Sequence, residues 1–216
     1  MKNITLTMML LSVGFDAICK PASATFNGSI NLEDQEYDAL TVNGAANFTN
    51  IKAVTLHANG ALNAEDCVFE KATISGGVNL DNCLVSKTLT VHGGFHTQDS
   101  KYADVTVHGG FCAENSEITG KTIVMGGSNC TDCTLNEFVC NGRDIVFKNC
   151  DISGSITVEK LSTHWFWSFF TSEKQELKLT TTAVHGDISF EKDGGIVILK
   201  GDCKIHGKVI NGTIIS

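Results

Sequence analysis

The chain has 216 residues and a formal net charge of −8, with 21 glycines, nine cysteines and a single proline. Collagen-like sequences and proline-rich linkers are excluded, because both need many prolines. The charged fraction of 19% is too low for a typical disordered chain. The negative charge argues against a nucleic-acid partner, because phosphate binding needs a basic face. No apolar run reaches the roughly 18 residues that a membrane-spanning helix needs.

Residues 1–24 are predicted to be a signal peptide. Lys2 supplies a positive charge, a mostly apolar stretch runs over residues 4–18, and Ala22-Ser23-Ala24 has the small-residue pattern of a cleavage site. The mature chain is therefore expected to be exported, periplasmic or secreted, with no transmembrane span. Cleavage after Ala24 removes Cys19 and leaves eight cysteines, an even number that favours disulfides in an oxidising compartment.

Over residues 25–158 the chain repeats itself every 16 or 17 residues. An Asn or Asp (Asx) recurs at this spacing, and a Gly stands six residues before it. The Asx column is Asn50, Asp66, Asn82, Asp99, Asn115, Asp132 and Asn149. The Gly column is Gly44, Gly60, Gly76, Gly93, Gly109 and Gly126, and Arg143 breaks it in the last repeat. Between the two columns apolar and polar residues alternate, which is typical of β-strands.

Each repeat thus predicts short strands joined by a Gly corner and an Asx corner. Gly is expected because it tolerates a positive φ at a sharp bend, and Asn and Asp tolerate the left-handed region. A unit this short cannot bury its apolar face alone, so units stacked about 4.8 Å apart must share one core. We predict an all-β fold, a single-stranded parallel β-helix (β-solenoid) with three-sided coils of 16–17 residues. An accidentally regular β-sandwich is the alternative.

Asn and Asp alternate strictly in the Asx column. Because stacked like charges repel, we interpret the alternation as a structural device that keeps the Asp charges two coils apart. The alternative is a calcium-binding row made of Asp66, Asp99 and Asp132. Calcium needs six or more oxygens at about 2.4 Å, which this spacing does not gather.

Four cysteines directly follow Asx residues: Cys67, Cys83, Cys133 and Cys150. Neighbouring coils place Cα atoms within disulfide range. We therefore predict a Cys67–Cys83 and a Cys133–Cys150 disulfide, each contributing roughly 3 kcal/mol.

The pairing of the other four cysteines stays open. They are Cys112, Cys130, Cys140 and Cys203. A Cys112–Cys130 bond would leave Cys140–Cys203 by elimination. Alternatively, the spacing Cys130-Thr-Asp-Cys133, with Cys140 and Cys150 nearby, would indicate zinc or redox chemistry in a cytosolic protein.

His92 and His108 also occupy neighbouring coils, and the pattern Val/Ile-His-Gly recurs at His185 and His206. Two adjacent histidines could hold a metal. The same column, directly before the Gly column, also carries Asn43, Asn59, Ser75 and Met125. We therefore interpret this column as a polar corner ladder, and we predict no metal and no cofactor.

Residues 159–175 interrupt the repeat, and coils resume over residues 176–216. The insertion holds five clustered aromatic residues: Trp165, Phe166, Trp167, Phe169 and Phe170. One interpretation is a loop or helix that covers an open edge of the solenoid. The other is a hydrophobic site at which these five residues bind a protein or glycan surface.

The runs Val184-His-Gly-Asp-Ile-Ser-Phe and Ile205-His-Gly-Lys-Val-Ile-Asn-Gly-Thr-Ile resemble bactofilins, a polymer-forming cytoskeletal family of β-helix proteins. The resemblance is one of pattern, over residues 37–158 and 177–216. It implies a β-helix fold and end-to-end stacking into filaments. Two features depart from it, because bactofilins are cytosolic and poor in cysteine, and because the aromatic insertion is foreign to their pattern.

The leading functional hypothesis is an exported, non-enzymatic β-solenoid that acts as a structural or adhesive module of a bacterial envelope or secreted fraction. The second is a bactofilin-like scaffold that associates with itself end to end. The third is a polysaccharide-active enzyme. It would need clustered outward carboxylates such as Glu65, Asp81 and Glu114, which we expect other residue types to separate along the stack.

Overall fold

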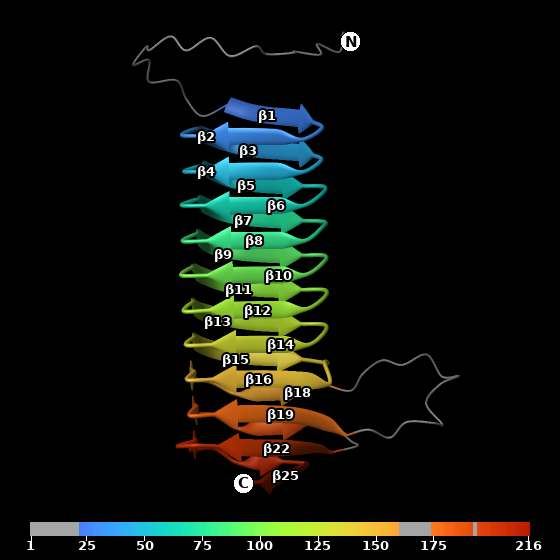
Figure 1. Ribbon diagram of the computed structural model, residues 1–216, viewed down its shortest axis with the longest axis vertical. Coiled ribbons are helices and arrows are strands. Elements are labelled where there is room, and N and C mark those ends of the chain that lie inside the picture. Colours follow the sequence, from blue (N-terminus) through green and yellow to red (C-terminus); the bar gives the residue numbers. More distant parts are fainter. Residues whose placement is uncertain (1–21, 160–173, 192–193) are drawn as a thin grey trace, which may run out of the picture.

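A computed structural model describes residues 22–159, 174–191 and 194–216. It is an all-β chain of parallel strands stacked as a solenoid of about 10 turns, which confirms the predicted fold class (Figure 1). Within the described residues, no helix is long and apolar enough to cross a membrane. The predicted signal peptide lies outside the described residues up to residue 21, and the first strand begins at Ala22, so cleavage after Ala24 would shorten that strand.

Two sheets run the length of the solenoid. The 14-stranded sheet starts with one long strand per coil: β1 (Ala22–Asn27), β3 (Glu36–Asn43), β5 (Lys52–Ala58), β7 (Val68–Ile74), β9 (Leu84–Val91), β11 (Lys101–Val107), β13 (Glu117–Val124) and β15 (Thr134–Cys140). After β15, two short strands replace each long one: β17 (Asp151–Ile152), β18 (Ile156–Val158), β20 (Ala183–Val184), β21 (Ile188–Phe190), β23 (Lys204–Ile205) and β24 (Val209–Ile210).

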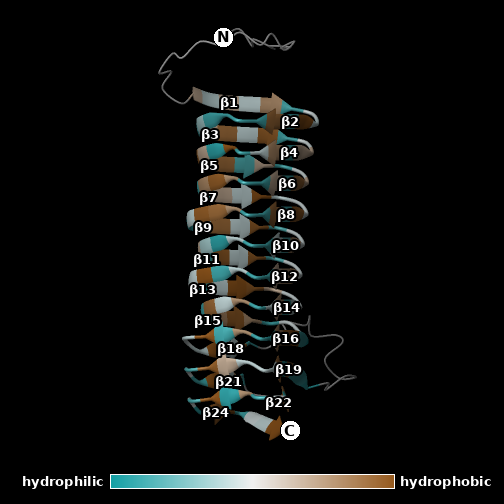
Figure 2. Cartoon of the chain, turned by 60° about the vertical axis from the view of Figure 1, so that its left-hand side comes forward, coloured by the Kyte–Doolittle hydropathy of each residue, from teal (hydrophilic) through white to brown (hydrophobic). Residues whose placement is uncertain are grey.

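The 11-stranded sheet receives one strand from each coil: β2 (Ile30–Glu33), β4 (Ala46–Thr49), β6 (Leu62–Glu65), β8 (Val78–Asp81), β10 (Phe95–Gln98), β12 (Phe111–Glu114), β14 (Ser128–Thr131), β16 (Asp144–Lys148), β19 (Gln175–Thr180), β22 (Gly195–Lys200) and β25 (Gly212–Ile215). Each strand pairs with its equivalents one coil away. Phe95 of β10, for example, lies opposite Val78 and Phe111. All three side chains are buried, so equivalent apolar residues form continuous core columns. Figure 2 shows the matching sequence pattern, with hydrophobic stretches recurring on successive strands.

The long strands turn a third corner near their middle. In β5 the inward side chains are Ala53, Leu56 and Ala58, so Val54 and Thr55 both face outward and the alternation changes phase between them. In two of the three 17-residue coils the extra residue is absorbed here, because β9 and β13 have eight residues where β5, β7 and β11 have seven. In the third, the extra residue is Arg143, which lies between the Gly corner and the Asx corner. This mid-strand corner makes the coil three-sided, as predicted.

The Gly corner has the expected positive φ at Gly44 and Gly60, at 150° and 156°, but the later glycines of the column are needed for another reason. A Cβ on Gly93 would lie 2.3 Å from the carbonyl oxygen of Gly76 one coil earlier, and a Cβ on Gly109 would lie equally close to that of Gly93. Close backbone stacking therefore excludes a side chain, and neither Gly93 nor Gly109 has a left-handed φ. The column also continues past Gly126, because Gly142 stacks on it. Arg143 is an added residue and does not replace that glycine.

The Asx corner carries the left-handed backbone. Asp34 and the seven Asx residues of the repeat have φ between 46° and 56°, which Asn and Asp tolerate better than other side chains. Asn50 donates its side-chain amide to Asp34 at 2.7 Å, and Asn82 and Asn115 bond to the Asp one coil earlier in the same way. The alternation therefore pairs donors with acceptors besides spacing the charges.

Candidate functional site

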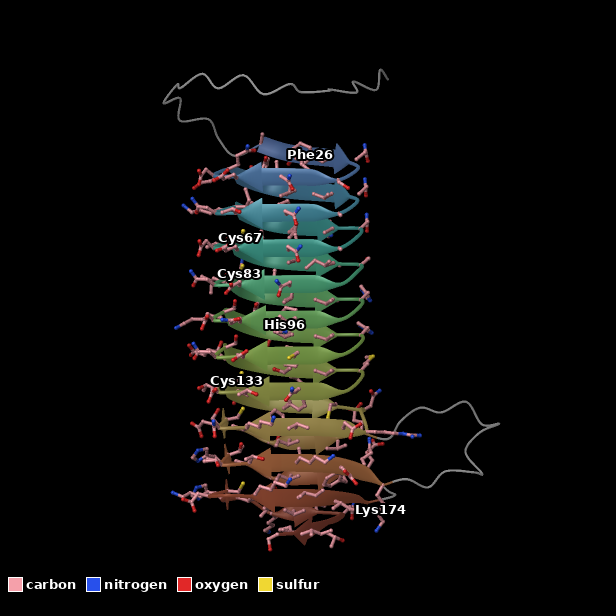
Figure 3. The ribbon with its side chains drawn as sticks, in the orientation of Figure 1. Phe26, Cys67, Cys83, His96, Cys133 and Lys174 are labelled. Carbon is pink, nitrogen blue, oxygen red and sulfur yellow. The ribbon has the colours of Figure 1, made fainter. Side chains whose placement is uncertain are left out.

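The five aromatic residues proposed to bind a partner, Trp165 to Phe170, lie outside the described residues. The described ends of their segment lie on one coil, near the Gly corner. The Gln175 side chain donates to the carbonyl oxygens of Glu159 at 2.8 Å and Gly142 at 3.1 Å. Lys174 stands at the return point in Figure 3. The insertion thus leaves and re-enters the solenoid at one place.

The column that follows the Asx corner is a buried ladder of small polar side chains. Figure 3 shows Cys67, Cys83 and Cys133 along this edge. In the ladder, Cys67 donates to the carbonyl two residues earlier at 3.1 Å, Ser100 does so at 2.6 Å, and Thr182 at 2.9 Å. Backbone N–H groups one coil earlier donate to these side chains, as Cys83 does to Ser100 at 2.9 Å. Cys, Ser and Thr therefore perform the same structural task here.

The four cysteines predicted to form disulfides are free thiols in the structure. The Cys83 thiol donates to Cys67, which lowers the pKa of Cys67 and raises that of Cys83. Cys150 stands in the same relation to Cys133. The coil geometry thus places both predicted pairs side by side, and the covalent bonds themselves stay a prediction.

The other four cysteines do not form a cluster. Cys130 of β14 faces the core, and burial raises the pKa of its thiol. Cys112 is on the outward face of β12. These two lie on opposite faces of the sheet, which disfavours a bond between them. Burial also raises the pKa of Cys140 to about 12. No three His, Cys, Asp or Glu side chains of the described residues gather as a metal site.

The outward carboxylates lie closer together than expected. Glu65 of β6 is directly opposite Asp81 of β8, and only Gln98 stands between Asp81 and Glu114. The expectation that other residue types separate all three is therefore wrong for the first pair. Both carboxylates lie on the outward face of the sheet, with Glu65 exposed and Asp81 half-buried. A shallow groove of about 810 Å³ on the same sheet is lined instead by residues such as Gly94, His96 and Cys112.

The last described coil presents apolar side chains that nothing among the described residues covers. Ile210, Ile214 and Ile215 are 43%, 49% and 50% exposed. Inward residues next to them, Ile205 and Val209, are only partly buried although their columns are fully buried in earlier coils. This coil therefore offers both unpaired strand edges and open ends of the core columns.

The first described coil, like the last, leaves the end of the core open, but its charge is different. Phe26 and Ile30 are partly buried core residues, and Figure 3 shows Phe26 at that end of the stack. Residues 22–43 contain four carboxylates and no Lys or Arg: Glu33, Asp34, Glu36 and Asp38. Residues 195–216 contain three lysines and one carboxylate: Lys200, Lys204, Lys208 and Asp202. One end of the solenoid is thus acidic and the other is basic.

Comparison with protein-family models, with curated proteins and with solved structures finds no match to this chain. The two open ends of the solenoid are therefore assigned as the candidate functional site on geometry and charge alone.

Proposed function

We propose that this protein is a non-enzymatic structural solenoid whose copies associate head to tail, the last coil of one chain on the first coil of the next. The observation that carries the proposal is the pair of open, oppositely charged ends. End-to-end stacking is also what the resemblance to bactofilins implies. Here it rests on the open core residues Ile205, Val209 and Ile214 and on the acidic residues around β2 and β3.

The contact would extend interactions that already hold the coils together. Each coil pairs in parallel with the next and buries the same inward columns, so a second copy continues both sheets and covers the open core. Fully burying an isoleucine side chain contributes about 1.5–3 kcal/mol before the costs of association. A stacked copy would cover the open inward columns at Ile205, Val209 and Ile214, which together are enough to support a weak contact.

Charge selects the orientation of the contact. Two acidic ends repel each other, as do two basic ends, whereas an acidic end attracts a basic one. A head-to-tail contact uses different surfaces on the two partners and leaves one of each free, so the assembly grows as an open linear array. We propose that this array is formed by an exported chain. An adhesive role for Trp165 to Phe170 remains the alternative.

Charge reversal tests the contact. Lys204→Glu with Lys208→Glu makes the last coil acidic, and Glu33→Lys with Glu36→Lys and Asp38→Lys makes the first end basic. Each of these two variants alone should sediment as a monomer at low ionic strength. An equimolar mixture should associate again, because the reversed ends now complement each other. Lys148→Glu, on the middle of the solenoid, is the matched control and should associate like the parent chain.

Association that survives both reversals, or a mixture that stays monomeric, would overturn the head-to-tail proposal. Adhesion is tested separately with glycan and envelope fractions. If the insertion is adhesive, Trp165→Ala with Trp167→Ala should remove saturable binding. Binding that persists in this variant rejects the aromatic segment as the adhesive site.

A further inference from the structure

Two histidines and a methionine occupy successive coils of one outward column. His92 and His108 are in register because Val91 pairs with Val107, and Met125 follows because Val107 pairs with Val124. The imidazole rings of His92 and His108 are stacked with centroids 4.7 Å apart and planes at 22°. Met125 is 47% exposed. We infer that His92, His108 and Met125 form a binding site for monovalent copper.

The hydrogen bonding of the column separates this site from a polar ladder. In the first coils the ladder exists as predicted, because Asn43 donates to Asn27 and Asn59 donates to Asn43, each at 2.8 Å. A thioether cannot continue such a chain of N–H donors, since Met has only a weak acceptor sulfur. Nor does burial explain Met125, which keeps nearly half of its surface in water. The change from Asn to His, His and Met therefore calls for another explanation.

The donor chemistry selects the metal. Imidazole binds copper and zinc, whereas a thioether is a soft ligand that favours Cu(I) over harder divalent ions. Two nitrogens and one sulfur satisfy Cu(I) without any carboxylate. This donor set contains only two groups of the His, Cys, Asp and Glu types. The lack of three such groups at any one place among the described residues is therefore compatible with the site.

The spacing of adjacent coils allows a shared ion once the side chains rotate. Metal–imidazole bonds are about 2.0–2.1 Å long, so two nitrogens that share one metal lie at most about 4.2 Å apart. The stacked rings have centroids 4.7 Å apart, and both exposed imidazoles must rotate out of the stack to turn one nitrogen each toward a shared ion. Met125 is flexible about three side-chain bonds and reaches the same point from the next coil.

The surroundings leave room for a cation. The residues that directly follow the two histidines and Met125 in sequence are glycines. The nearest outward residues before them, two positions earlier in the strand, are uncharged. These neighbours are Gly93, Gly109, Gly126, Thr90, Thr106 and Ile123. No lysine or arginine within these two columns opposes a bound cation, and the net charge of −8 favours cations in general.

The second stacked pair provides an internal comparison. His185 and His206 have centroids 5.0 Å apart, but His185 Nε2 is also hydrogen-bonded to Asp151 at 2.8 Å. These two histidines lie at the mid-strand corner, where Gly186 stacks on Gly154, and no methionine is within reach in sequence register. A nitrogen and carboxylate set of this kind is harder, so it should not retain Cu(I) against a competing chelator.

The test is anaerobic Cu(I) titration of the full chain against bicinchoninate, with ascorbate present. Cys19, Cys112 and Cys203 are changed to Ser in every sample, as are the paired thiols Cys67, Cys83, Cys133 and Cys150, because thiolates bind Cu(I) strongly and Ser already fills the same ladder at Ser100 and Ser116. We expect one Cu(I) per chain and a sulfur contribution in the copper X-ray absorption spectrum. Met125→Leu should remove the sulfur contribution and weaken binding by roughly ten- to a hundredfold.

His92→Asn with His108→Asn should abolish high-affinity Cu(I) binding. Asn is the matched replacement because Asn43 and Asn59 occupy the same column in a folded coil. His185→Asn with His206→Asn is the control and should bind Cu(I) like the parent chain, and circular dichroism verifies that each variant is folded. The inference is overturned if folded Met125→Leu keeps the parent affinity, or if the His92 and His108 double variant still binds copper.

Discussion

The coils before and after β15 form the third corner of the coil in different ways. Before β15 the third corner lies within a continuous long strand, and its residues are diverse. After β15 the strand is split, and Gly154, Gly186 and Gly207 stack at the corner, where a Cβ on Gly186 would lie 2.5 Å from the Gly154 carbonyl oxygen. Backbone contact between coils is therefore a device that this chain uses at two different corners.

The comparison explains why one short motif has two structural meanings. His92 and His108 precede glycines at the corner between the long and short strands, whereas His185 and His206 precede glycines at the mid-strand corner. The tripeptide Val/Ile-His-Gly thus marks a stacked glycine but does not say which corner that glycine occupies. The number of residues between the glycine and the next strand distinguishes the two corners.

The largest expected effect comes from adding one methyl group to a stacked glycine. Gly109→Ala should destabilise the early coils by about 3 kcal/mol or more, because the new Cβ overlaps a backbone oxygen that cannot move away. Gly186→Ala should do the same in the late coils. Gly110→Ala is the matched control, since nothing lies within 4 Å of its Cβ, and its stability should stay equal or rise slightly. Urea denaturation followed by circular dichroism measures all three, and equal losses at Gly109 and Gly110 would contradict the stacking explanation.

Alkaline pH should lower the stability of the fold at β15, where the early coils meet the late coils. Burial raises the pKa of Cys140 at the end of β15 from 9.0 to about 12, so the unfolded chain releases this proton first. Stability supplied by the neutral thiol is complete below pH 9 and falls by about 1.4 kcal/mol per pH unit until about pH 12. Cys140→Ala should flatten this part of the stability profile in reducing buffer. An unchanged slope would show that Cys140 does not contribute to it.

Two buried threonines should respond in opposite ways. Thr97 shares a hydrogen bond with Tyr102 at 2.6 Å, whereas the Thr122 hydroxyl has no hydrogen-bond partner among the described residues. Thr97→Val should therefore destabilise the fold by about 1–2 kcal/mol, and Thr122→Val should be neutral or stabilising by about 1 kcal/mol. Thermal unfolding of the two variants gives the comparison, and a loss at Thr122 would mean that its hydroxyl has a partner in solution.

The smallest expected effect concerns the Asx column in the late coils. Thr181 takes the place of Asx with φ of 49°, although a β-branched residue is strained in the left-handed region. Thr181→Asn should stabilise the chain by about 1 kcal/mol, and Asn149→Thr one coil earlier should destabilise it by a similar amount. Denaturant midpoints measure both, and a stabilised Asn149→Thr would contradict the role assigned to Asx.

The predicted disulfides are tested by counting thiols. If the chain folds in an oxidising compartment, Cys67 and Cys83 should be protected from alkylation and joined in peptide maps, as should Cys133 and Cys150. Ser100 and Ser116 occupy the same ladder without any such bond, so Cys67→Ser with Cys83→Ser should fold with only the disulfide contribution lost, roughly 3 kcal/mol. Four freely alkylated thiols in the exported, unfolded chain would reject both bonds.

The repeat was predictable because its constraints are local and recur with each coil. A left-handed backbone favours Asn or Asp at Asn50 and its equivalents, and alternation shows which residues of a strand face inward. The role of Gly93 was misread because backbone contact between coils leaves no trace in a single repeat. The closeness of Glu65 to Asp81 was missed for a similar reason, since it depends on strand register. Charge at the two ends is visible in sequence only after the first and last coils are identified.

Electron microscopy of the full chain at low ionic strength tests the central claim most directly. If oppositely charged open coils join head to tail, unbranched filaments one solenoid wide should form, with all solenoids pointing the same way. Raising the salt concentration should shorten them, because the attraction between the acidic and basic ends is screened. Filaments in which neighbouring solenoids point in opposite directions, or single solenoids at every concentration, would contradict the account.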